Sequence, residues 1–416
     1  MNLIFRAARI VDPNGPYHGA VTDVLIQDGS IRNIGEKLAN PDRLEEITRE
    51  NLHVSPGWFD SSVSLGEPGF EDRENIANGL KIAALSGFTG IALQPNSHPV
   101  IDNQALVHFV KSKAQGATAL YPIGALTKNA EGKDLAELFD MKNAGAIAFG
   151  DYNKSISNAN LLKIGLQYVQ DFDGLLIAFC QDAHLKGNGV ANEGIVSTRL
   201  GLKGIPNLAE ELTVARNLFL LQYTGGKMHI PTISTAGSVE LVRKAKKKGL
   251  KVTCSASVHH LVLTDETLNG FDTRFKVTPP LRTETDRQAL LEAVSDGTID
   301  MITSDHNPID IELKKMDFDS AQPGTIGLES AFGALMTVLP LDVIVKGLTF
   351  GREVFGIGNA HIAEGADANL TLFNPEPEWT FTKDRIGSKS KNAALLNAAM
   401  KGEVYGVYNR KKLQLR

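Results

Sequence analysis

The spacing of hydrophobic and polar residues changes twice along the 416-residue chain. Residues 1–52 alternate short β-type runs with turns, and "QDGS" at 27–30 is typical of a β-hairpin turn. From residue 53 to 359 short apolar runs alternate with amphipathic helical stretches, and after residue 360 the β pattern returns. We therefore predict a composite β-sandwich domain from residues 1–52 and 360–416, and a second domain over residues 53–359.

Eight apolar runs in the central segment have the length of buried strands. They are "HVSPGWFDSS", "FTGIALQPN", "ATALYPIGAL", "GAIAFGD", "GLLIAFCQD", "KMHIPTIST", "KVTCSASVHH" and "MITSDHNP". Amphipathic helical stretches such as "ENIANGLKIAALSG" and "SVELVRKAKKKG" lie between them. Eight buried strands separated by helices predict an α/β fold of the (β/α)8 TIM-barrel type, whose reacting groups lie at the C-terminal ends of the strands.

The composition describes an ordinary globular protein. Hydrophobic residues make up 42%, charged residues 22%, and the formal net charge is -5, which argues against a nucleic-acid binder or a disordered chain. No run approaches the roughly 18 to 20 apolar residues of a membrane span, and the N-terminus lacks a secretion-signal pattern. Cys180 and Cys254 lie in apolar runs, so we expect a reduced cytoplasmic protein without a disulfide framework or a membrane partner.

The ends of the eight runs are where candidate chemistry is expected. In order along the chain they carry Ser62 and Ser64, Asn96, Asp151, Phe179, Thr232, His259 with His260, and Asp305 with His306. Three longer stretches accompany them: "EPGFEDRENIANGLKIAALSGFTGIALQPNSHPVID", "VTPPLRTETDRQALLEAVSDGTIDMITSDHNP" and "IAEGADANLTLFNPEPEW". With these motifs in order at compatible spacing, the chain resembles a bacterial dihydroorotase of the amidohydrolase superfamily over essentially its whole length.

The resemblance implies a site from which most working parts are missing. The family's first-strand motif Asp-x-His-x-His-x-Arg-Glu-Pro-Gly reads "DSSVSLGEPG" here, so Ser62 and Ser64 replace two zinc-binding histidines and Gly66 replaces the arginine that binds the substrate carboxylate. Two further histidine ligands and a second carboxylate-binding residue are replaced by Phe179, Thr232 and Ile309. The resemblance leaves Asp151 as a bridging carboxylate, Asp305 as a relict general base and Asn96 as a relict substrate contact.

These substitutions predict that the chain holds no catalytic zinc, the family's metal. Such a zinc takes about three protein ligands, and it lowers the pKa of its bound water to about 7. Hydroxyl groups are weak donors to zinc, and phenylalanine offers none. Without the ion we expect either Asp151 or Asp305 to take up a proton or to find a cation such as Lys154.

Three functions stay open from the sequence. The first is a catalytically inactive dihydroorotase homologue that serves as a structural or regulatory subunit, for which the resemblance implies a homodimer and aspartate carbamoyltransferase as partner. The second is an active cyclic-amide hydrolase with a one-metal site on Asp151, Asp305 and His306. The third is a small-molecule binding module that uses Asn96. A serine nucleophile at Ser62 or Ser64 lacks a base beside it in the sequence.

Overall fold

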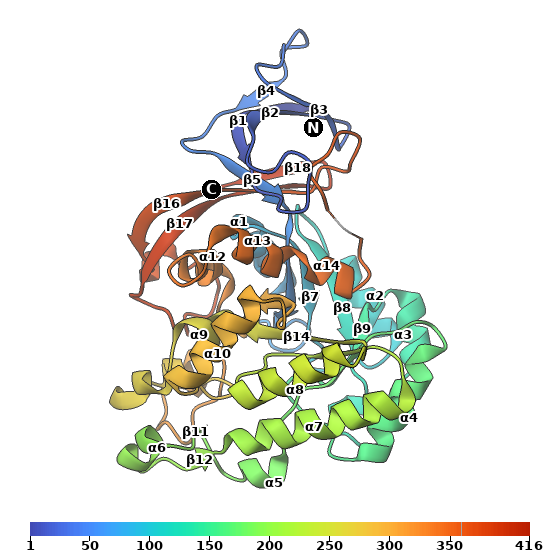
Figure 1. Ribbon diagram of the computed structural model, residues 1–416, viewed down its shortest axis with the longest axis vertical. Helices are drawn as coiled ribbons and strands as arrows, with labels where there is room; N and C mark the ends of the chain where they lie inside the picture. Colours follow the sequence, from blue (N-terminus) through green and yellow to red (C-terminus); the bar gives the residue numbers. More distant parts are fainter. Residues whose placement is uncertain (359) are drawn as a thin grey trace.

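The computed structural model describes residues 1–358 and 360–416. Within them, eight parallel strands form the barrel in sequence order (Figure 1). Their bounds are β6 Trp58–Val63, β7 Phe88–Leu93, β8 Ala119–Gly124, β9 Ala148–Phe149, β10 Leu176–Ile177, β13 Met228–Ile230, β14 Val252–Ser257 and β15 Met301–Thr303. Each falls in one of the eight predicted runs, so the predicted TIM barrel is confirmed.

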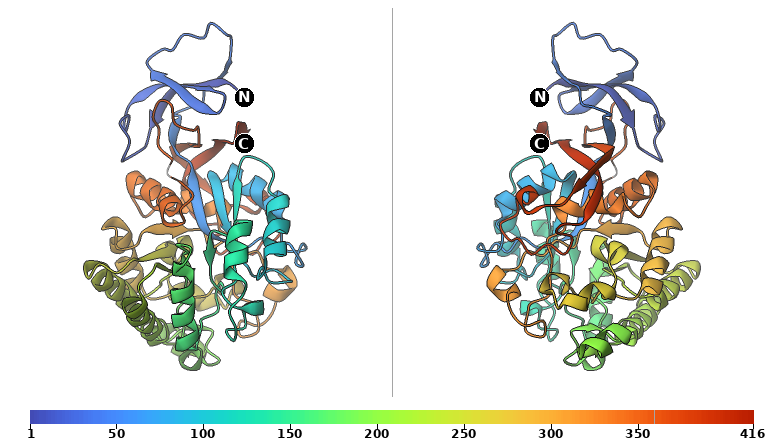
Figure 2. Two further views of the ribbon diagram at one scale, coloured as in Figure 1. Left: turned by 90° about the vertical axis from the view of Figure 1, so that its right-hand side faces the viewer. Right: turned by 90° about the vertical axis from the view of Figure 1, so that its left-hand side faces the viewer.

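Helices follow the strands and cover the outside of the barrel (Figures 1 and 2). The longer ones are α1 Ile76–Leu85, α2 Gln104–Ser112, α3 Leu138–Ala144, α4 Ala159–Gln170, α7 Asn207–Thr224, α8 Ala236–Lys247, α10 Glu284–Ser295 and α13 Leu341–Thr349. Short helices α5 Ala183–Lys186, α6 Ile195–Leu200, α9 Val258–Val262, α11 Ile311–Lys314, α12 Ala331–Leu335 and α14 Gly351–Val354 lie in the connections. None of the helices in the described part of the chain has the length and apolar character needed to cross a membrane.

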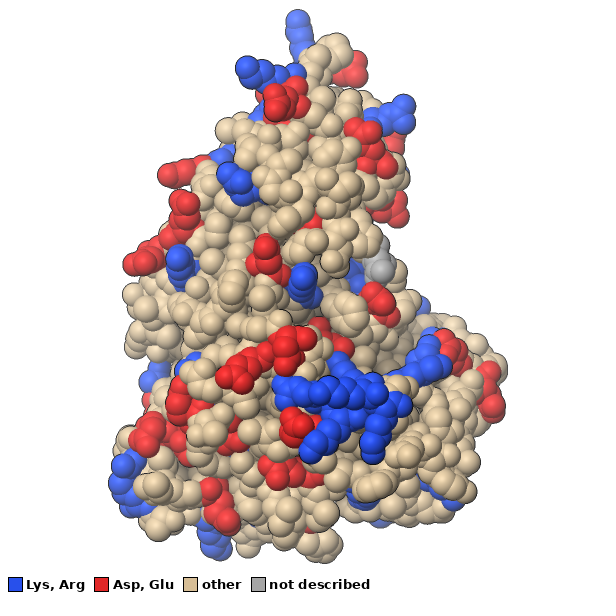
Figure 3. Space-filling view, in the orientation of Figure 1, with Lys and Arg blue, Asp and Glu red and all other residues tan. Residues whose placement is uncertain are grey.

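Local sequence explains where these helices start and how they end. The side chain of Asn75 accepts a hydrogen bond from the Asn78 amide and caps α1, and Thr235 caps α8 in the same way. The basic cluster at the end of α8 suits the negative end of the helix dipole. Arg243 pairs with Asp296 there, and Lys247 is exposed, so the cluster is a solvated face (Figure 3).

The two chain ends share a second sheet above the barrel in Figure 1. It runs in the order β18-β17-β16-β5-β1-β2-β3, with β4 beside β1. The bounds are β1 Leu3–Ile10, β2 Val21–Gln27, β3 Ser30–Gly35, β4 Glu45–Ile47, β5 His53–Pro56, β16 Leu370–Thr380, β17 Ala399–Asn409 and β18 Lys412–Leu415. The predicted joining of both ends in one β domain is confirmed, whereas the domain boundaries stay a prediction.

The first predicted run is divided between the two sheets at Gly57. Its first half, β5, pairs with β1 and β16, and its second half, β6, opens the barrel. Trp58 begins the barrel half and is fully buried, with its ring 5.0 Å from that of Phe332 and 5.6 Å from that of Phe373. An aromatic cluster at this junction therefore joins the terminal sheet to the barrel core.

The barrel closes between β6 and β15. The buried carboxylate of Asp60 accepts hydrogen bonds from the Ser304 amide at 3.0 Å and from the Thr303 hydroxyl. One step further along, the Ser64 amide donates to the His306 carbonyl at 2.8 Å. These bonds bring the ends of the first and last barrel strands together, which is where the candidate site lies.

Candidate functional site

A small, partly enclosed cavity lies at the C-terminal ends of the barrel strands. Its volume is about 10 Å³, and it is lined by Ser62, Gln94, Tyr152, Asn153, Ile177, Phe179, Pro231, Thr232, Thr278 and Asp305. The fold thus brings together four positions that the sequence places on four different strands: Ser62, Phe179, Thr232 and Asp305. The volume matches about one water molecule, whereas pockets for small organic ligands measure roughly 300–1,000 Å³.

Asp305 is the only ionisable carboxylate in the lining of this cavity. It accepts a hydrogen bond from the Ser62 hydroxyl at 2.9 Å, and Ser62 in turn accepts one from the Gln94 amide group at 3.2 Å. Burial raises the pKa of Asp305 to about 7, and the neighbouring charge of Asp60 adds to the rise while Ser62 opposes it. The carboxyl group therefore holds a proton at a pH where an exposed aspartate would be ionised.

Tyr152 fills space beside Asp305, and sequence reasoning missed it. Its hydroxyl is hydrogen-bonded to Ser64, and burial together with the charge of Asp305 raises the pKa of this hydroxyl well above its ordinary value. The backbone of Tyr152 has a φ of 55°, a left-handed conformation that is rare for a bulky residue. Tyr152 follows the candidate residue Asp151 in the sequence, but no sequence signal indicates that its backbone directs the ring into the cavity.

Asp151, the other remnant ligand position, is held elsewhere. One carboxylate oxygen accepts a hydrogen bond from the Thr127 amide at 3.0 Å, and the other accepts one from the Thr127 hydroxyl. Burial raises the pKa of Asp151, and Lys154 is only a minor opposing influence. Because Asp151 does not line the cavity that holds Asp305, the two carboxylates do not share one site there.

Asn96 lies at the edge of the site. Its side-chain oxygen accepts a hydrogen bond from the Ser64 hydroxyl at 3.0 Å, so Ser64 connects it to Tyr152. At the position of the second lost carboxylate contact, Ile309 is buried, and its amide donates to the Asn392 side chain at 3.2 Å. An apolar side chain therefore stands at the second predicted carboxylate contact, and Asn96, the predicted substrate contact, is bound to Ser64.

Gly66 occupies a backbone conformation that an arginine would not tolerate. Its φ is +71°, and a Cβ atom added there would lie 2.4 Å from the Phe70 carbonyl oxygen. We expect Gly66→Arg to lower the free energy of unfolding by about 2 kcal/mol or more, because left-handed strain and a backbone clash add. Urea unfolding measures this loss, and Gly66→Ala should share it because the cost arises at Cβ. A fully stable Gly66→Arg protein would contradict this description of the turn.

Of the histidines near the strand ends, His260 and His306 have hydrogen-bond partners, whereas the buried Nε2 atoms of His259 and His306 have none among the described residues. His306 accepts a hydrogen bond at Nδ1 from the Gly327 amide at 3.2 Å, and burial lowers its pKa to about 3. His260 contacts the Ser257 hydroxyl at 2.6 Å and the Pro279 carbonyl at 3.1 Å. Neither His259 nor His260 lines the cavity. These contacts fit structural roles better than replacement metal ligands.

The donor set and the size of the cavity do not fit a catalytic zinc. Its lining offers one carboxylate, the hydroxyls of Ser62, Tyr152, Thr232 and Thr278, and the amides of Gln94 and Asn153, whereas a catalytic zinc takes about three nitrogen, sulfur or carboxylate ligands. Across residues 1–358 and 360–416, no group of three or more histidine, cysteine, aspartate or glutamate residues is arranged to hold a metal ion.

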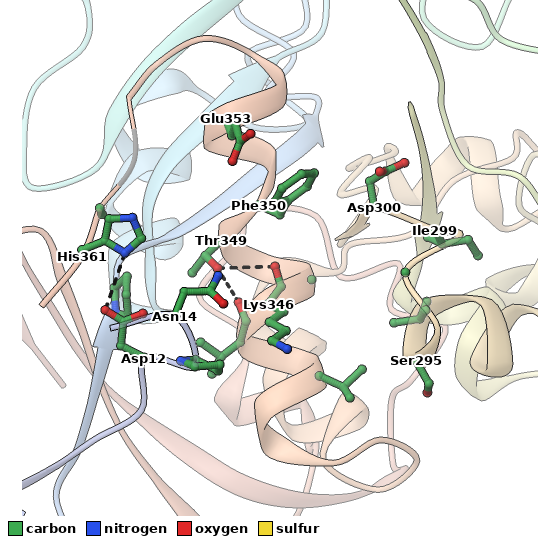
Figure 4. Close-up of a pocket in the computed structure, with 18 of the residues that line it drawn as sticks. Asp12, Asn14, Ser295, Ile299, Asp300, Lys346, Thr349, Phe350, Glu353 and His361 are labelled. Carbon is green, nitrogen blue, oxygen red and sulfur yellow. Dashed lines mark hydrogen bonds and ion pairs between the residues drawn. The ribbon is translucent and has the colours of Figure 1, made fainter. Parts of the chain in front are cut away.

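A larger hollow of about 430 Å³ lies at the other end of the barrel, against the terminal sheet (Figure 4). Pro56 and Asp300, which line it, stand just before β6 and β15. Within it His361 lies 3.7 Å from the carboxylate of Asp12. Because barrel chemistry is found at the C-terminal ends of the strands, this hollow is not the counterpart of an active site despite its size.

Comparisons with known proteins agree with the family resemblance. The family model described as "Dihydro-orotase-like" matches residues 52–238. The chain is 42% identical to a dihydroorotase from Pelotomaculum thermopropionicum and 38% identical to one from Geobacter metallireducens, in both cases over 97% of this chain and 96% of the relative. In fold it is similar to an L-hydantoinase (dihydropyrimidinase) from Arthrobacter aurescens, with a TM-score of 0.87, 20% identity and coverage of 99% and 95% of the two chains. With relatives matched along nearly its whole length, the chain belongs to the dihydroorotase-like amidohydrolase family.

Proposed function

We propose that this protein is a catalytically inactive dihydroorotase homologue of pyrimidine biosynthesis that acts in the cytoplasm as a structural or regulatory subunit. The observation that carries the proposal is the small cavity at the strand ends, in which Ser62, Phe179 and Thr232 stand at the ligand positions predicted to be lost and Tyr152 forms part of the wall. A ring-shaped substrate does not fit a space of about 10 Å³.

The chemistry of the lining supports the same conclusion. Opening a cyclic amide by hydrolysis requires an activated water, and a metal ion supplies one by lowering the pKa of water from about 15.7 to about 7. The side chains around Asp305 do not fit such an ion, and burial raises the pKa of Asp305 itself to about 7. A carboxylate with a pKa near 7 can accept a proton at neutral pH, but it is too weak a base to deprotonate water that no metal ion has activated.

Metal content and turnover test the proposal together. We expect purified protein to contain far less than one zinc per chain by elemental analysis and to show no opening or closure of the dihydroorotate ring. The dihydroorotase from Pelotomaculum thermopropionicum, prepared in the same way, is the positive control. Stoichiometric zinc accompanied by turnover would overturn the proposal.

The two alternatives gain less support. A one-metal hydrolase needs Asp151, Asp305 and His306 around one ion, yet Asp151 is bound to Thr127 and His306 to Gly327. A ligand-binding role for Asn96 needs an open cavity beside it. Elemental analysis addresses the first alternative, because it predicts about one ion per chain, and thermal shift with dihydroorotate addresses the second.

An exposed apolar surface supports the homodimer that belongs to this proposal. Four side chains lie along one outer face of α7: Leu208, Leu212, Phe219 and Tyr223 are 53%, 51%, 73% and 78% exposed. Ile164 and Tyr168 on the neighbouring helix α4 continue the surface. Figure 3 shows few charged side chains over α7, below the lysines of α8. Contiguous apolar surface of this kind is typical of a protein–protein interface.

The area of this α7–α4 surface fits a second copy of the chain. With about 200 Å² for an aromatic and about 100 Å² for an aliphatic side chain, its six residues expose roughly 500 Å². A standard interface buries about 800 Å² per partner, and homodimer interfaces are about 65% apolar. The apolar area that each partner buries is therefore also roughly 500 Å². The surface carries little charge to repel its own copy across a two-fold axis.

We therefore expect a dimer in solution that a charge on α7 disrupts. Light scattering with size-exclusion chromatography should give twice the monomer mass for the native chain and the monomer mass for Phe219→Glu. Val21→Glu, at a 48% exposed site in the terminal sheet, is the control and should stay dimeric. A Phe219→Glu protein that remains dimeric would place the interface elsewhere.

Aspartate carbamoyltransferase is proposed as a second partner on the family resemblance alone. Mixing the two purified proteins should give a co-eluting species larger than either. If the two elute separately at micromolar concentrations while the homodimer persists, this partnership is wrong and the inactive-homologue proposal is unaffected.

A further inference from the structure

A second cavity opens on the same face of the barrel, next to the small one. Its volume is about 460 Å³, and Thr278 lines both cavities. Its walls come from the loop after α5, from β12 Gly204–Ile205 and from the segments around Lys276 and Asp319. Lys186, Lys203 and Lys276 are among the lining residues, and Asp319 is the one acidic residue among them. We call this cavity the lysine pocket.

Two lysines at the lysine pocket are buried without an acidic partner. Lys276 is 7% exposed, and its ammonium group donates to the carbonyl oxygens of Phe318 and Asp319 at 2.6 and 2.9 Å. Lys314, behind it, is 2% exposed and donates to the carbonyl oxygens of Lys276 and Gln322 at 3.2 and 3.0 Å. Among the residues that the structure describes, no carboxylate lies within 4.0 Å of either ammonium group. Buried charges are normally paired, since carbonyl dipoles offset only part of the cost of burial.

Two further lysines at the edge of the lysine pocket, its rim, add positive charge. Lys186 is half-buried and Lys203 is exposed, and within residues 1–358 and 360–416 neither ammonium group has an ion-pair partner. Burial lowers the pKa of Lys276, the negative charge of Asp319 partly opposes this, and the positive charge of Lys186 lowers the pKa further. Burial also lowers the pKa of Lys314 to about 7, with the charge of Lys276 as a second cause. The lysines therefore lie close enough to repel one another, and a negative charge between them would relieve that repulsion.

We propose that the lysine pocket binds a small anion through a carboxylate or phosphate group. Its volume lies within the usual range for small-ligand sites, unlike that of the small cavity. Lysine ammonium groups bind carboxylates and phosphates as point charges, with shorter and stronger hydrogen bonds than neutral donors make. The inference goes beyond the proposed function, because it gives an inactive barrel a ligand site on its former catalytic face. It does not require the small cavity to widen.

Thermal shift and calorimetric titration with two probes, inorganic phosphate and succinate, test the proposal. We expect saturable binding of at least one probe at constant ionic strength, with chloride as the non-binding comparison. The double variant Lys186→Ala/Lys203→Ala should weaken it at least tenfold. These rim residues are not fully buried, so the variant should fold normally. Lys248→Ala, which removes an exposed lysine at the end of α8, is the matched control and should bind as the native chain does.

The outcomes separate the two ligand sources and the two proposals. Binding of phosphate alone indicates a phosphorylated ligand, and binding of succinate alone indicates a carboxylate. No saturable binding of either probe, or equal weakening by Lys248→Ala, would overturn the lysine pocket as a site. Neither result changes the expectation for zinc and turnover, so failure here is distinguishable from failure of the inactive-homologue proposal.

Discussion

Asp305→Asn is expected to stabilise the folded protein at pH 8 by as much as about 4 kcal/mol. The fold raises the pKa of Asp305 from 3.8 to about 7 by burying it, and each unit of pKa shift corresponds to about 1.4 kcal/mol. Asparagine keeps an oxygen that can accept the Ser62 hydrogen bond and carries no charge to bury. The free energy of unfolding in urea at several pH values measures the effect.

The pH dependence of the native protein follows from the same shift. Below pH 3.8 Asp305 is protonated in both the folded and the unfolded state and contributes nothing. Between about pH 4 and 7 the unfolded state releases the proton while the folded state keeps it, so stability falls as pH rises. Above about pH 7 the full penalty applies. The advantage of Asp305→Asn should therefore be absent near pH 4 and largest at pH 8.

Asp60→Asn provides the contrast to Asp305→Asn within the same sheet. The carboxylate of Asp60 is also buried, but it accepts hydrogen bonds from the Ser304 and Ser62 amides and from Thr303. An asparagine NH₂ group would face one of these donors, so this variant should lose stability. If Asp305→Asn also lost stability at pH 8, an ionised Asp305 with a bound cation would be the better description, and the proposed empty site would be wrong.

Glu210→Ala is expected to lower the free energy of unfolding by about 3–5 kcal/mol. Glu210 lies on α7 beneath the strand that carries Thr232, and it accepts hydrogen bonds from the amides of Ser234 and Thr235 at 2.9 and 3.2 Å. Its carboxylate also lies 3.7 Å from the guanidinium of Arg282, and both side chains are 2% exposed. Removing the glutamate leaves an uncompensated buried charge, which is the costly way to break such a pair.

Equilibrium unfolding in urea measures the loss, and Glu292→Ala is the control. Glu292 is an exposed glutamate on α10, where substitution should change stability by no more than about 0.5 kcal/mol. An equal effect of the two variants would show that the Glu210–Arg282 network does not stabilise the barrel. If Glu210→Ala costs much more stability than Glu292→Ala, the Glu210–Arg282 network stabilises the barrel directly beneath the candidate site.

Much of the architecture could be predicted from the sequence alone because it depends on local patterns. The eight apolar runs predicted the eight barrel strands, since burial of a parallel strand requires a short continuous apolar segment. The pattern also predicted that Ser62, Phe179 and Thr232 stand at strand ends, and the family resemblance implied that they replace metal ligands. The division of the first run at Gly57 was not visible, because pairing with β16 depends on a segment about 300 residues away.

The state of the site was decided only by the tertiary structure. The sequence predicted Asp151 and Asp305 as remnant ligand positions but not their partners: Asp151 is bound to Thr127, and Asp305 lines a small cavity with Tyr152. The residue type does not predict a left-handed φ such as that of Tyr152, because the surrounding packing imposes it. The lysine pocket likewise combines segments distant in sequence. Local periodicity thus determined the strands and the helices, and the family resemblance implied the missing ligands, while long-range packing decided the size of the two cavities at the strand ends.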